Sequence, residues 1–284
     1  MAFHNHKHAH ATKAFAKTNS RYLEEGGRPM KKDADSDYQD VVARGNMYRF
    51  LSTIYLQAPT QELVLKVIDA EFLEELASLY SASSVAELDT YAGSADLERE
   101  LALIKQDHMD LFAVPAGRYV TPFEDVYRGT RMDGNQERGP LLGVQAITVK
   151  IMYRMAGAEV DRTCKELPTH IGVELAFMTF LCDSEAVAMG SDQGTAQPDA
   201  ETSSPPDPSL FRQLQRRFLK EHLNDWFPQL NQAIQAKANT HFYRGLGQVT
   251  EEFIARDTAS LTSRNISEQR ARVIQCGSAF PQPG

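Results

Sequence analysis

The sequence predicts an all-α protein in which about seven helices form a single bundle. Three observations support this fold class. Apolar residues recur at steps of three and four through most of the chain, which is the period of a helix with one buried face. No segment of four to eight residues alternates cleanly between apolar and polar residues, so no strand is indicated. With 284 residues, of which 42% are hydrophobic, the chain can bury a sizeable core.

The first half of the chain contains three predicted helices and a long loop. The first helix begins near Val41 and ends before Pro59, and the second follows with Thr60 as its N-cap. The third runs through residues 94–112. The next stretch, residues 113–140, is rich in glycine, proline and aromatic residues, and we expect an ordered loop there.

The second half contains four further predicted helices. The fourth covers residues 141–157, and the fifth, residues 167–185, is apolar on nearly every side, which is typical of a helix at the centre of a bundle. A linker rich in glycine, serine and proline, residues 190–208, separates the fifth helix from the sixth. The sixth contains Pro228, where we expect a kink, and the last spans residues 239–261.

The expected layout is one helical domain, residues 39–264, between two loose ends. Residues 1–38 are polar and basic and predict a disordered tail, and residues 265–284 predict a loose C-terminal tail. Alternating histidines near the start of the chain have a spacing that suits Ni(II), Cu(II) or Zn(II): His4, His6, His8 and His10. We prefer the alternative that this segment is a low-complexity tail or cloning remnant with only adventitious metal affinity.

Composition limits the classes of function. The formal charge of −8 and the pI near 5.5 disfavour binding to nucleic acid or to an anionic membrane surface, and they suit a basic partner. The three cysteines include no CxxC pair, so neither a disulfide framework nor a zinc site is indicated and a reducing cytoplasm fits best. No apolar run is long enough for a signal peptide or a membrane span, so we expect neither export nor membrane insertion.

The common sequence patterns of catalysis are missing. The chain contains no glycine-rich phosphate loop, no HExxH and no GxSxG, and its paired acidic residues fit solvated helix faces. We therefore expect a protein that is not an enzyme and that has no cofactor of its own.

Three segments together resemble the TorD/DmsD family of redox-enzyme maturation chaperones, relatives of the NarJ chaperones. Residues 107–129 resemble the family's loop of the form LF..P.G....P.ESVY. Residues 166–185 resemble its E.PDHIG.EL.FM..L segment, and residues 216–230 resemble its FL..HL..W.P.F segment. Order and spacing agree, and the resemblance covers residues 41–261.

The resemblance implies a cytoplasmic chaperone without catalytic turnover. Its implied partner is the apo-form of a molybdenum or tungsten bis-pyranopterin oxidoreductase, whose twin-arginine signal peptide it binds until the cofactor has been inserted. Either a monomer or a domain-swapped dimer is compatible with the long linker. Two alternatives from other classes are an enzyme that handles a nucleotide or molybdopterin, and a structural subunit of a reductase complex.

A receptor for a twin-arginine peptide needs carboxylates for the basic part and an apolar groove for the continuation. The acid-rich second and third helices suit the first need. Aromatic side chains suit the second because they bury a large area at a small entropy cost. The candidates are Tyr119, Phe123, Tyr127 and Trp226, and Glu124 of the same loop is a further candidate for client binding. In the alternative interpretation the loop residues Phe123, Glu124 and Tyr127 define the shape of the loop, and Trp226 belongs to the core.

In the family, an Asp-His pair before the central helix is implicated in peptide binding. Glu166 and His170 match this pattern, whereas Thr169 stands where the Asp is usual, so one carboxylate is missing. We expect Thr169 to cap the helix through the amide of Gly172 and to leave His170 in the first turn, where the positive helix end keeps its imidazole neutral. For His170, a ligand-facing role and a purely structural role both remain open.

Overall fold

The structure, a computed structural model, describes residues 3–4, 32–93, 97–129, 139–191 and 207–277. Nearly all regular structure in these residues is helical, so the predicted all-α class is confirmed. The predicted linker, apart from its two ends, and the histidines His6, His8 and His10 lie outside the described residues. The chain divides into two compact units. Unit 1 contains residues 1–56 and 142–215, and unit 2 contains residues 57–141 and 216–284.

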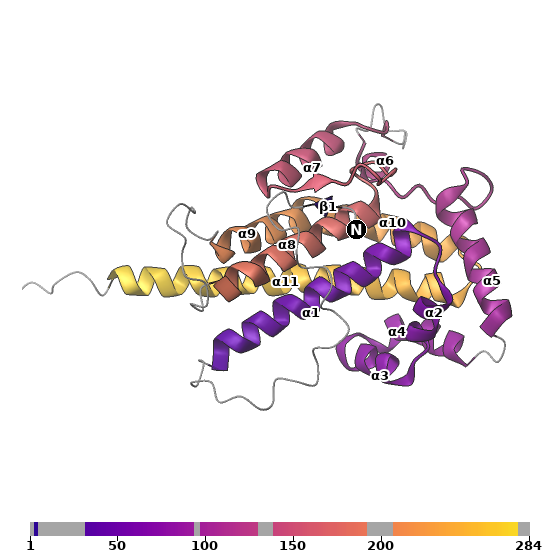
Figure 1. Cartoon of the computed structure of the whole chain (residues 1–284), viewed down its shortest axis with the longest axis horizontal. Helices are drawn as coiled ribbons and strands as arrows, with labels where there is room; N and C mark the ends of the chain where they lie inside the picture. The colour runs from indigo at the N-terminus through magenta and orange to yellow at the C-terminus, as the bar shows by residue number, and fades with distance from the viewer. Residues whose placement is uncertain (1–2, 5–31, 94–96, 130–138, 192–206, 278–284) are drawn as a thin grey trace, which may run out of the picture. The chain divides into compact units, whose positions relative to one another are not determined.

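Unit 1 is built on two long helices that lie side by side (Figure 1). Its described elements are α1 (Lys32–Leu56), α7 (Val144–Met155), α8 (Ile171–Ser191), most of α9 (Pro208–Phe218) and the short strands β1 (Phe3–His4) and β2 (Glu159–Val160). The backbones of α1 and α8 approach each other closely at Gly172. A Cβ atom added to this glycine would lie only 2.5 Å from Cγ of Leu56. Ser52 also donates a hydrogen bond of 2.8 Å to the carbonyl of Gly172.

A buried carboxylate joins α8 to α9 within unit 1. Glu185 accepts hydrogen bonds from Arg212 at 2.8 Å and from the amide of Gln215 at 2.7 Å. The side-chain oxygen of Gln215 in turn accepts from Arg44 of α1 at 2.7 Å. Because both oxygens of Glu185 accept hydrogen bonds, burial of this carboxylate is compensated.

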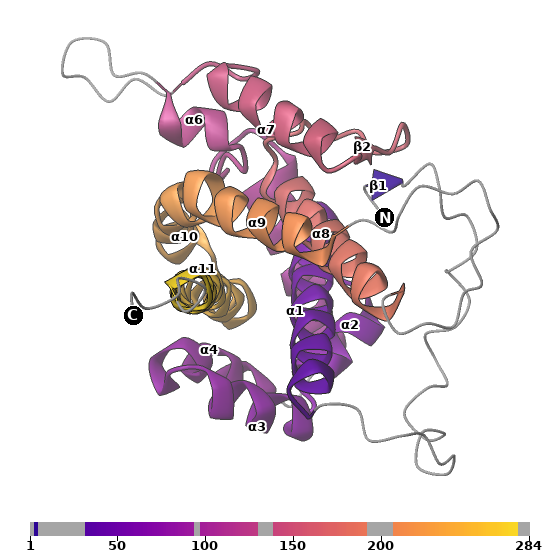
Figure 2. The ribbon, with the colours of Figure 1, turned by 90° about the vertical axis from the view of Figure 1, so that its left-hand side faces the viewer.

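Unit 2 contains the acid-rich helices and the C-terminal helices. Its described elements are α2 (Gln61–Val67), α3 (Ala70–Leu79), α4 (Ala82–Ala92), α5 (Leu97–His108), α6 (Glu124–Arg128), α10 (Asn224–Lys237), α11 (His241–Gly277) and the π-helical turns η2 (Met109–Ala113) and η3 (Leu219–Leu223). The helices α10 and α11 lie side by side (Figure 2). On α11, Gly245 allows a close approach to Leu88 of α4, since an added Cβ would lie 2.7 Å from Cγ of that leucine.

The second predicted helix is two helices in the structure. The hydroxyl of Thr60 accepts from the amide of Leu63, which confirms the predicted N-cap of α2. The chain then breaks because Asp69 caps a new helix, its carboxylate accepting from the amide of Phe72 at 3.2 Å. Helix α4, which follows α3, was not predicted.

The ends of the helical region extend beyond the predicted bounds. Helix α1 begins at Lys32, inside the segment for which we predicted a disordered tail, and α11 continues to Gly277. Phe3 and His4 form a strand pair with β2 in a chain for which no strand was predicted. In the part of the chain that the structure describes, no helix has the length and apolar content needed to cross a membrane.

Candidate functional site

The predicted residues before the central helix come together in unit 1. The segment that leads into α8 is held by Tyr153 of α7, whose hydroxyl donates a hydrogen bond of 2.8 Å to the carbonyl of Pro168. The next two residues, Thr169 and His170, are buried, at 0% and 3% exposure. Direct contact of these two side chains with a large partner would therefore require the segment to open.

The amide of Gly172, for which we predicted Thr169 as the acceptor, is bound by His170. The amide of Gly172 donates to Nδ1 of His170 over 3.0 Å, so this ring nitrogen carries no proton. The tautomer that fits this contact has its proton on Nε2. An imidazole reaches the amide two residues on, as the side chains of N-cap residues do.

Glu166 is the member of this group that solvent reaches. Its side chain is 40% exposed, and its Oε2 lies 3.9 Å from Nε2 of His170. Burial of its remaining surface raises the pKa of this carboxyl above its usual value. Glu166 thus places a carboxyl group at the surface near the buried imidazole, at a separation longer than a hydrogen bond.

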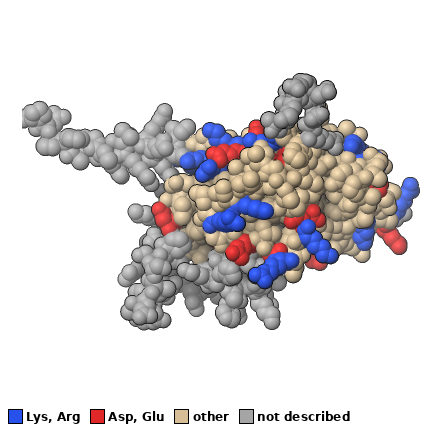
Figure 3. Space-filling model, turned by 90° about the horizontal axis from the view of Figure 1, so that it is seen from above, with Lys and Arg blue, Asp and Glu red and all other residues tan. Residues whose placement is uncertain are grey.

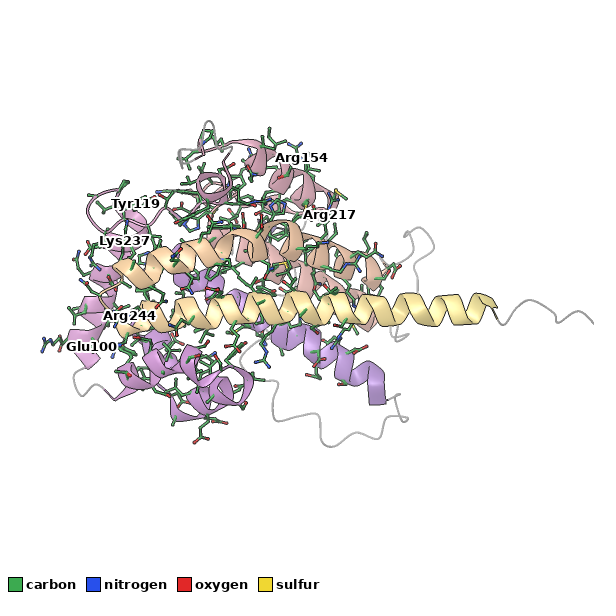
Figure 4. All side chains as sticks on the ribbon, turned by 180° about the vertical axis from the view of Figure 1, so that it is seen from behind. Glu100, Tyr119, Arg154, Arg217, Lys237 and Arg244 are labelled. Atoms are coloured by element: carbon green, nitrogen blue, oxygen red, sulfur yellow. The ribbon has the colours of Figure 1, made fainter. Side chains whose placement is uncertain are left out.

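Residues 114–123 of the predicted loop, which we call the aromatic loop, lie in unit 2 and are fixed by charged side chains. Arg118 pairs with Asp107 and with Asp110, and it also donates to the carbonyl of Lys237. The ammonium group of Lys237 donates to the carbonyl of Tyr119 over 2.7 Å, and Figure 4 shows these two residues close together. The loop therefore has a defined conformation, and the half-buried ring of Tyr119 is attached to a fixed backbone.

The other predicted residues of unit 2 gather around a buried carboxylate. Glu124 has no exposed surface and is contacted by Nδ1 of His222 and by the guanidinium of Arg128. The ring of Tyr127 stacks on that of Trp226 with centroids 5.6 Å apart and planes 28° apart. This arrangement agrees with the structural alternative for Glu124 and Trp226, whose side chains lie inside unit 2.

An exposed apolar stripe on α7 is a feature of unit 1 that we did not predict. The inner face of this helix buries Ala146, Val149, Met152 and Tyr153. On the outer face large apolar side chains remain in water at steps of three and four residues: Val144 at 67%, Ile147 at 60%, Ile151 at 49% and Met155 at 53% exposure. Soluble proteins seldom leave such a row uncovered unless it binds something. The sequence signal was the presence of two apolar faces on one short helix.

Basic side chains border the α7 stripe. Lys150 and Arg154 are exposed, one turn apart on the same helix, and α7 itself contains no acidic residue. Figure 3, a view from above Figure 1, shows lysine and arginine side chains beside aspartate and glutamate side chains, with uncharged surface between them. The apolar stripe suits an apolar partner segment. Because Lys150 and Arg154 border the stripe, the part of the partner that lies against α7 should carry little positive charge.

Comparison with known proteins places these features in a family. The family model described as the nitrate reductase delta subunit matches residues 74–232, which is more than half of the chain. This protein belongs to the nitrate reductase delta subunit family. The matched region of this family member begins in α3 and ends in α10, so it contains the aromatic loop, α7 and the Glu166–His170 segment.

Several curated relatives of this delta-subunit family member carry the names of chaperones. The chain is 29% identical to the perchlorate reductase assembly chaperone protein of Dechloromonas aromatica over 47% of its own length. It is 23% identical to the chaperone protein TorD of Colwellia psychrerythraea over 78% of the chain and 92% of that relative. It is 28% identical to the selenate reductase assembly chaperone protein of Thauera selenatis over 41% of the chain. The matches span about half of the perchlorate and selenate relatives, at 51% and 56% of their lengths.

Proposed function

We propose that this protein is a cytoplasmic assembly chaperone for an oxidoreductase that carries a molybdenum or tungsten bis-pyranopterin cofactor. In this proposal it binds the apo-enzyme and its twin-arginine signal peptide, and it releases the client for export after cofactor insertion. It performs no catalytic turnover. The observation that carries the proposal is the relationship to proteins named as assembly chaperones of perchlorate, selenate and chlorate reductases.

The α7 stripe supports a binding role in unit 1. A chaperone that holds an unfinished client must offer apolar surface to it, and such surface must stay exposed in the absence of the client. The four side chains of the stripe are branched or flexible and lie at helical spacing, so they suit an apolar segment laid along the helix.

The acidic surface of unit 2 supports recognition of the basic part of the signal peptide. Residues 57–108 contain eleven acidic and three basic residues, a net charge of −8 that equals the charge of the whole chain. Glu62, Glu71, Glu74, Glu75 and Asp89 are exposed members of this group. Carboxylates at such density attract guanidinium groups and accept bidentate hydrogen bonds from them.

Affinity capture from the native host under anaerobic growth tests the proposal. The captured material is identified by mass spectrometry, with attention to the N-terminal peptide of each partner. We expect the precursor of a molybdenum or tungsten enzyme that still bears its twin-arginine leader. Recovery of the mature, cofactor-loaded enzyme alone would instead support a structural subunit. Turnover of a nucleotide or of molybdopterin by the purified protein would support a small-molecule enzyme.

A further inference from the structure

The two short strands of unit 1 bring the first residues of the chain onto α7 and α8. β1 pairs with β2 in antiparallel register, with Phe3 opposite Val160 and His4 opposite Glu159, and Figure 2 shows the two strands side by side. β2 follows the end of α7 closely and is fixed there, because the amide of Ala158 donates to the carbonyl of Tyr153 over 2.9 Å. A strand pair of two residues has too few backbone bonds to be stable alone. A side chain must anchor it.

The anchor is the ring of Phe3, which lies among three aromatic rings of unit 1. Its centroid is 4.8 Å from that of Tyr153, with the planes at 82°, which is an edge-to-face contact. It is 5.7 Å from the ring of Phe177 and 6.3 Å from that of Phe180. Aromatic pairs in these geometries add stability beyond the area they bury. We call the space that the ring of Phe3 fills beside Tyr153, Phe177 and Phe180 the aromatic pocket.

This aromatic pocket shares its elements with the Glu166–His170 segment. Tyr153 contributes its ring to the pocket and its hydroxyl to the carbonyl of Pro168, directly before Thr169 and His170. Phe177 lies on α8, the helix that His170 caps. A peptide that displaces Phe3 would therefore contact Tyr153, the residue that positions this segment.

We propose that the aromatic pocket and the edge of β2 form a binding site for an extended peptide of the client, and that Phe3–His4 occupies this site as an intramolecular latch. That the peptide comes from an oxidoreductase client rests on the function proposed above. The ligand is a strand that adds to β2 and inserts one aromatic side chain. Glu159 stands opposite the next residue of that strand, so a basic residue is favoured there.

The latch lowers the apparent affinity for a competing peptide. A ligand that needs the open site binds more weakly in proportion to the fraction of molecules in which the site is open. If the latch is closed about nine-tenths of the time, opening it permanently raises the affinity about tenfold. Phe3→Ala removes the anchor and leaves the pocket intact, so this variant of the full chain isolates the effect.

The probe is a fluorescein-labelled synthetic peptide with the sequence of residues 1–10, and its binding is followed by fluorescence anisotropy. We expect the Phe3→Ala chain to bind it about tenfold more tightly than the wild-type chain does. A peptide in which the phenylalanine is replaced by alanine should bind neither chain. Equal affinity for the two chains, or no binding to either, would overturn the proposal. So would undiminished binding to a chain that carries Phe3→Ala together with Val160→Pro, because a proline at the residue opposite Phe3 disrupts strand pairing.

A second titration separates the site from the identity of its ligand. The leader peptide of the captured client is titrated into the wild-type and Phe3→Ala chains, and we expect the same tightening of about tenfold. If the peptide of residues 1–10 shows the tightening and the leader peptide binds both chains equally, the assignment of the pocket to the client leader is overturned. Failure to capture any client would concern the proposed function alone, since the titration with the chain's own peptide does not depend on it.

Discussion

The imidazole Nδ1 of His222 lies 2.9 Å from each carboxylate oxygen of Glu124, and neither residue is more than 3% exposed. The two residues are 98 positions apart in the sequence. Their contact ties the end of the aromatic loop to the π-helical turn η3 inside unit 2. The loop conformation therefore depends on a buried polar pair.

Loss of one member of this pair should destabilise unit 2. In the Glu124→Ala variant, His222 and Arg128 lose the carboxylate that they share, and removal of one partner of a buried ion pair costs about 3 kcal/mol or more. Urea denaturation measures the change in the free energy of unfolding. The double variant Glu124→Ala, His222→Leu is the control, and it should recover part of the loss because no unpaired imidazole remains. A single variant within about 0.5 kcal/mol of the wild type would show that the pair contributes little.

Close helix contact in unit 1 predicts different effects for two glycines of the same helix. A Cβ on Gly172 would lie 2.5 Å from Cγ of Leu56 and 3.2 Å from its backbone nitrogen, so Gly172→Ala should destabilise the protein by about 1–3 kcal/mol. Near the other end of α8, Gly190 has nothing within 4 Å of its added Cβ. Gly190→Ala should be neutral or stabilising by up to about 1 kcal/mol. Thermal unfolding of both variants measures the two changes in stability. Equal changes would argue against the close contact of α1 and α8.

The two possible roles of His170 can be separated by two substitutions. His170→Ala removes the acceptor of the Gly172 amide and should cost about 1 kcal/mol of stability. Asparagine is a good N-cap residue, so His170→Asn should keep most of that stability while it removes the group that faces Glu166. Binding of the client leader to both variants is measured by calorimetry. Loss of affinity in the asparagine variant indicates a role in recognition, and wild-type affinity in that variant would leave His170 with the cap alone.

A buried histidine of unit 2 makes stability depend on pH. Burial lowers the pKa of His108 from 6.5 to about 4. As the pH falls, the unfolded chain therefore takes up the proton first, so stability is full above pH 6.5 and is lost between pH 6.5 and about pH 4. At pH 5 the loss relative to pH 7.5 is about 2 kcal/mol.

The matched variant for this pH effect is His108→Gln, which does not titrate and still offers Tyr243 a polar partner in place of the present 3.0 Å contact. Urea unfolding of the wild type and the variant at pH 7.5 and pH 5.0 gives four free energies. The wild type should lose about 2 kcal/mol more than the variant does. An equal loss in both proteins would assign the pH dependence to other groups.

The elements that could be predicted from the sequence are those whose apolar residues keep a helical period. α1, α8 and α11 were found for this reason, and Thr60 was found because a cap needs only its own hydroxyl and the amides that follow. α4 was missed because its buried positions include Ser84 beside Val85 and Leu88, so its apolar stripe is weak. Local patterns carry no signal for a helix that is formed by tertiary contacts.

The candidate site could be predicted only where its contacts are local. Glu166 and His170 are four residues apart, and their proximity follows from the motif. The partner of Glu124, by contrast, depends on how η3 lies in unit 2, and spacing in the sequence cannot supply that. The strand pair of Phe3 could not be predicted for the same reason. A two-residue strand has no period, and the nearest ring that anchors Phe3 along the chain, that of Tyr153, belongs to the distant helix α7.

Charge on the exposed face of α7 should weaken client binding without loss of stability. Ile147 and Ile151 are 60% and 49% exposed, so replacement of both by lysine leaves the core untouched and should change the free energy of unfolding by less than about 0.5 kcal/mol. Two apolar anchors at the centre of an interface typically contribute enough that the affinity for the client precursor falls more than about tenfold. Leu210 on α9, also in unit 1 and 47% exposed, provides the control Leu210→Lys. Affinity capture with the three chains compares the recovered precursor. If the α7 variant retains as much precursor as the Leu210 variant does, the stripe is not the surface that holds the client.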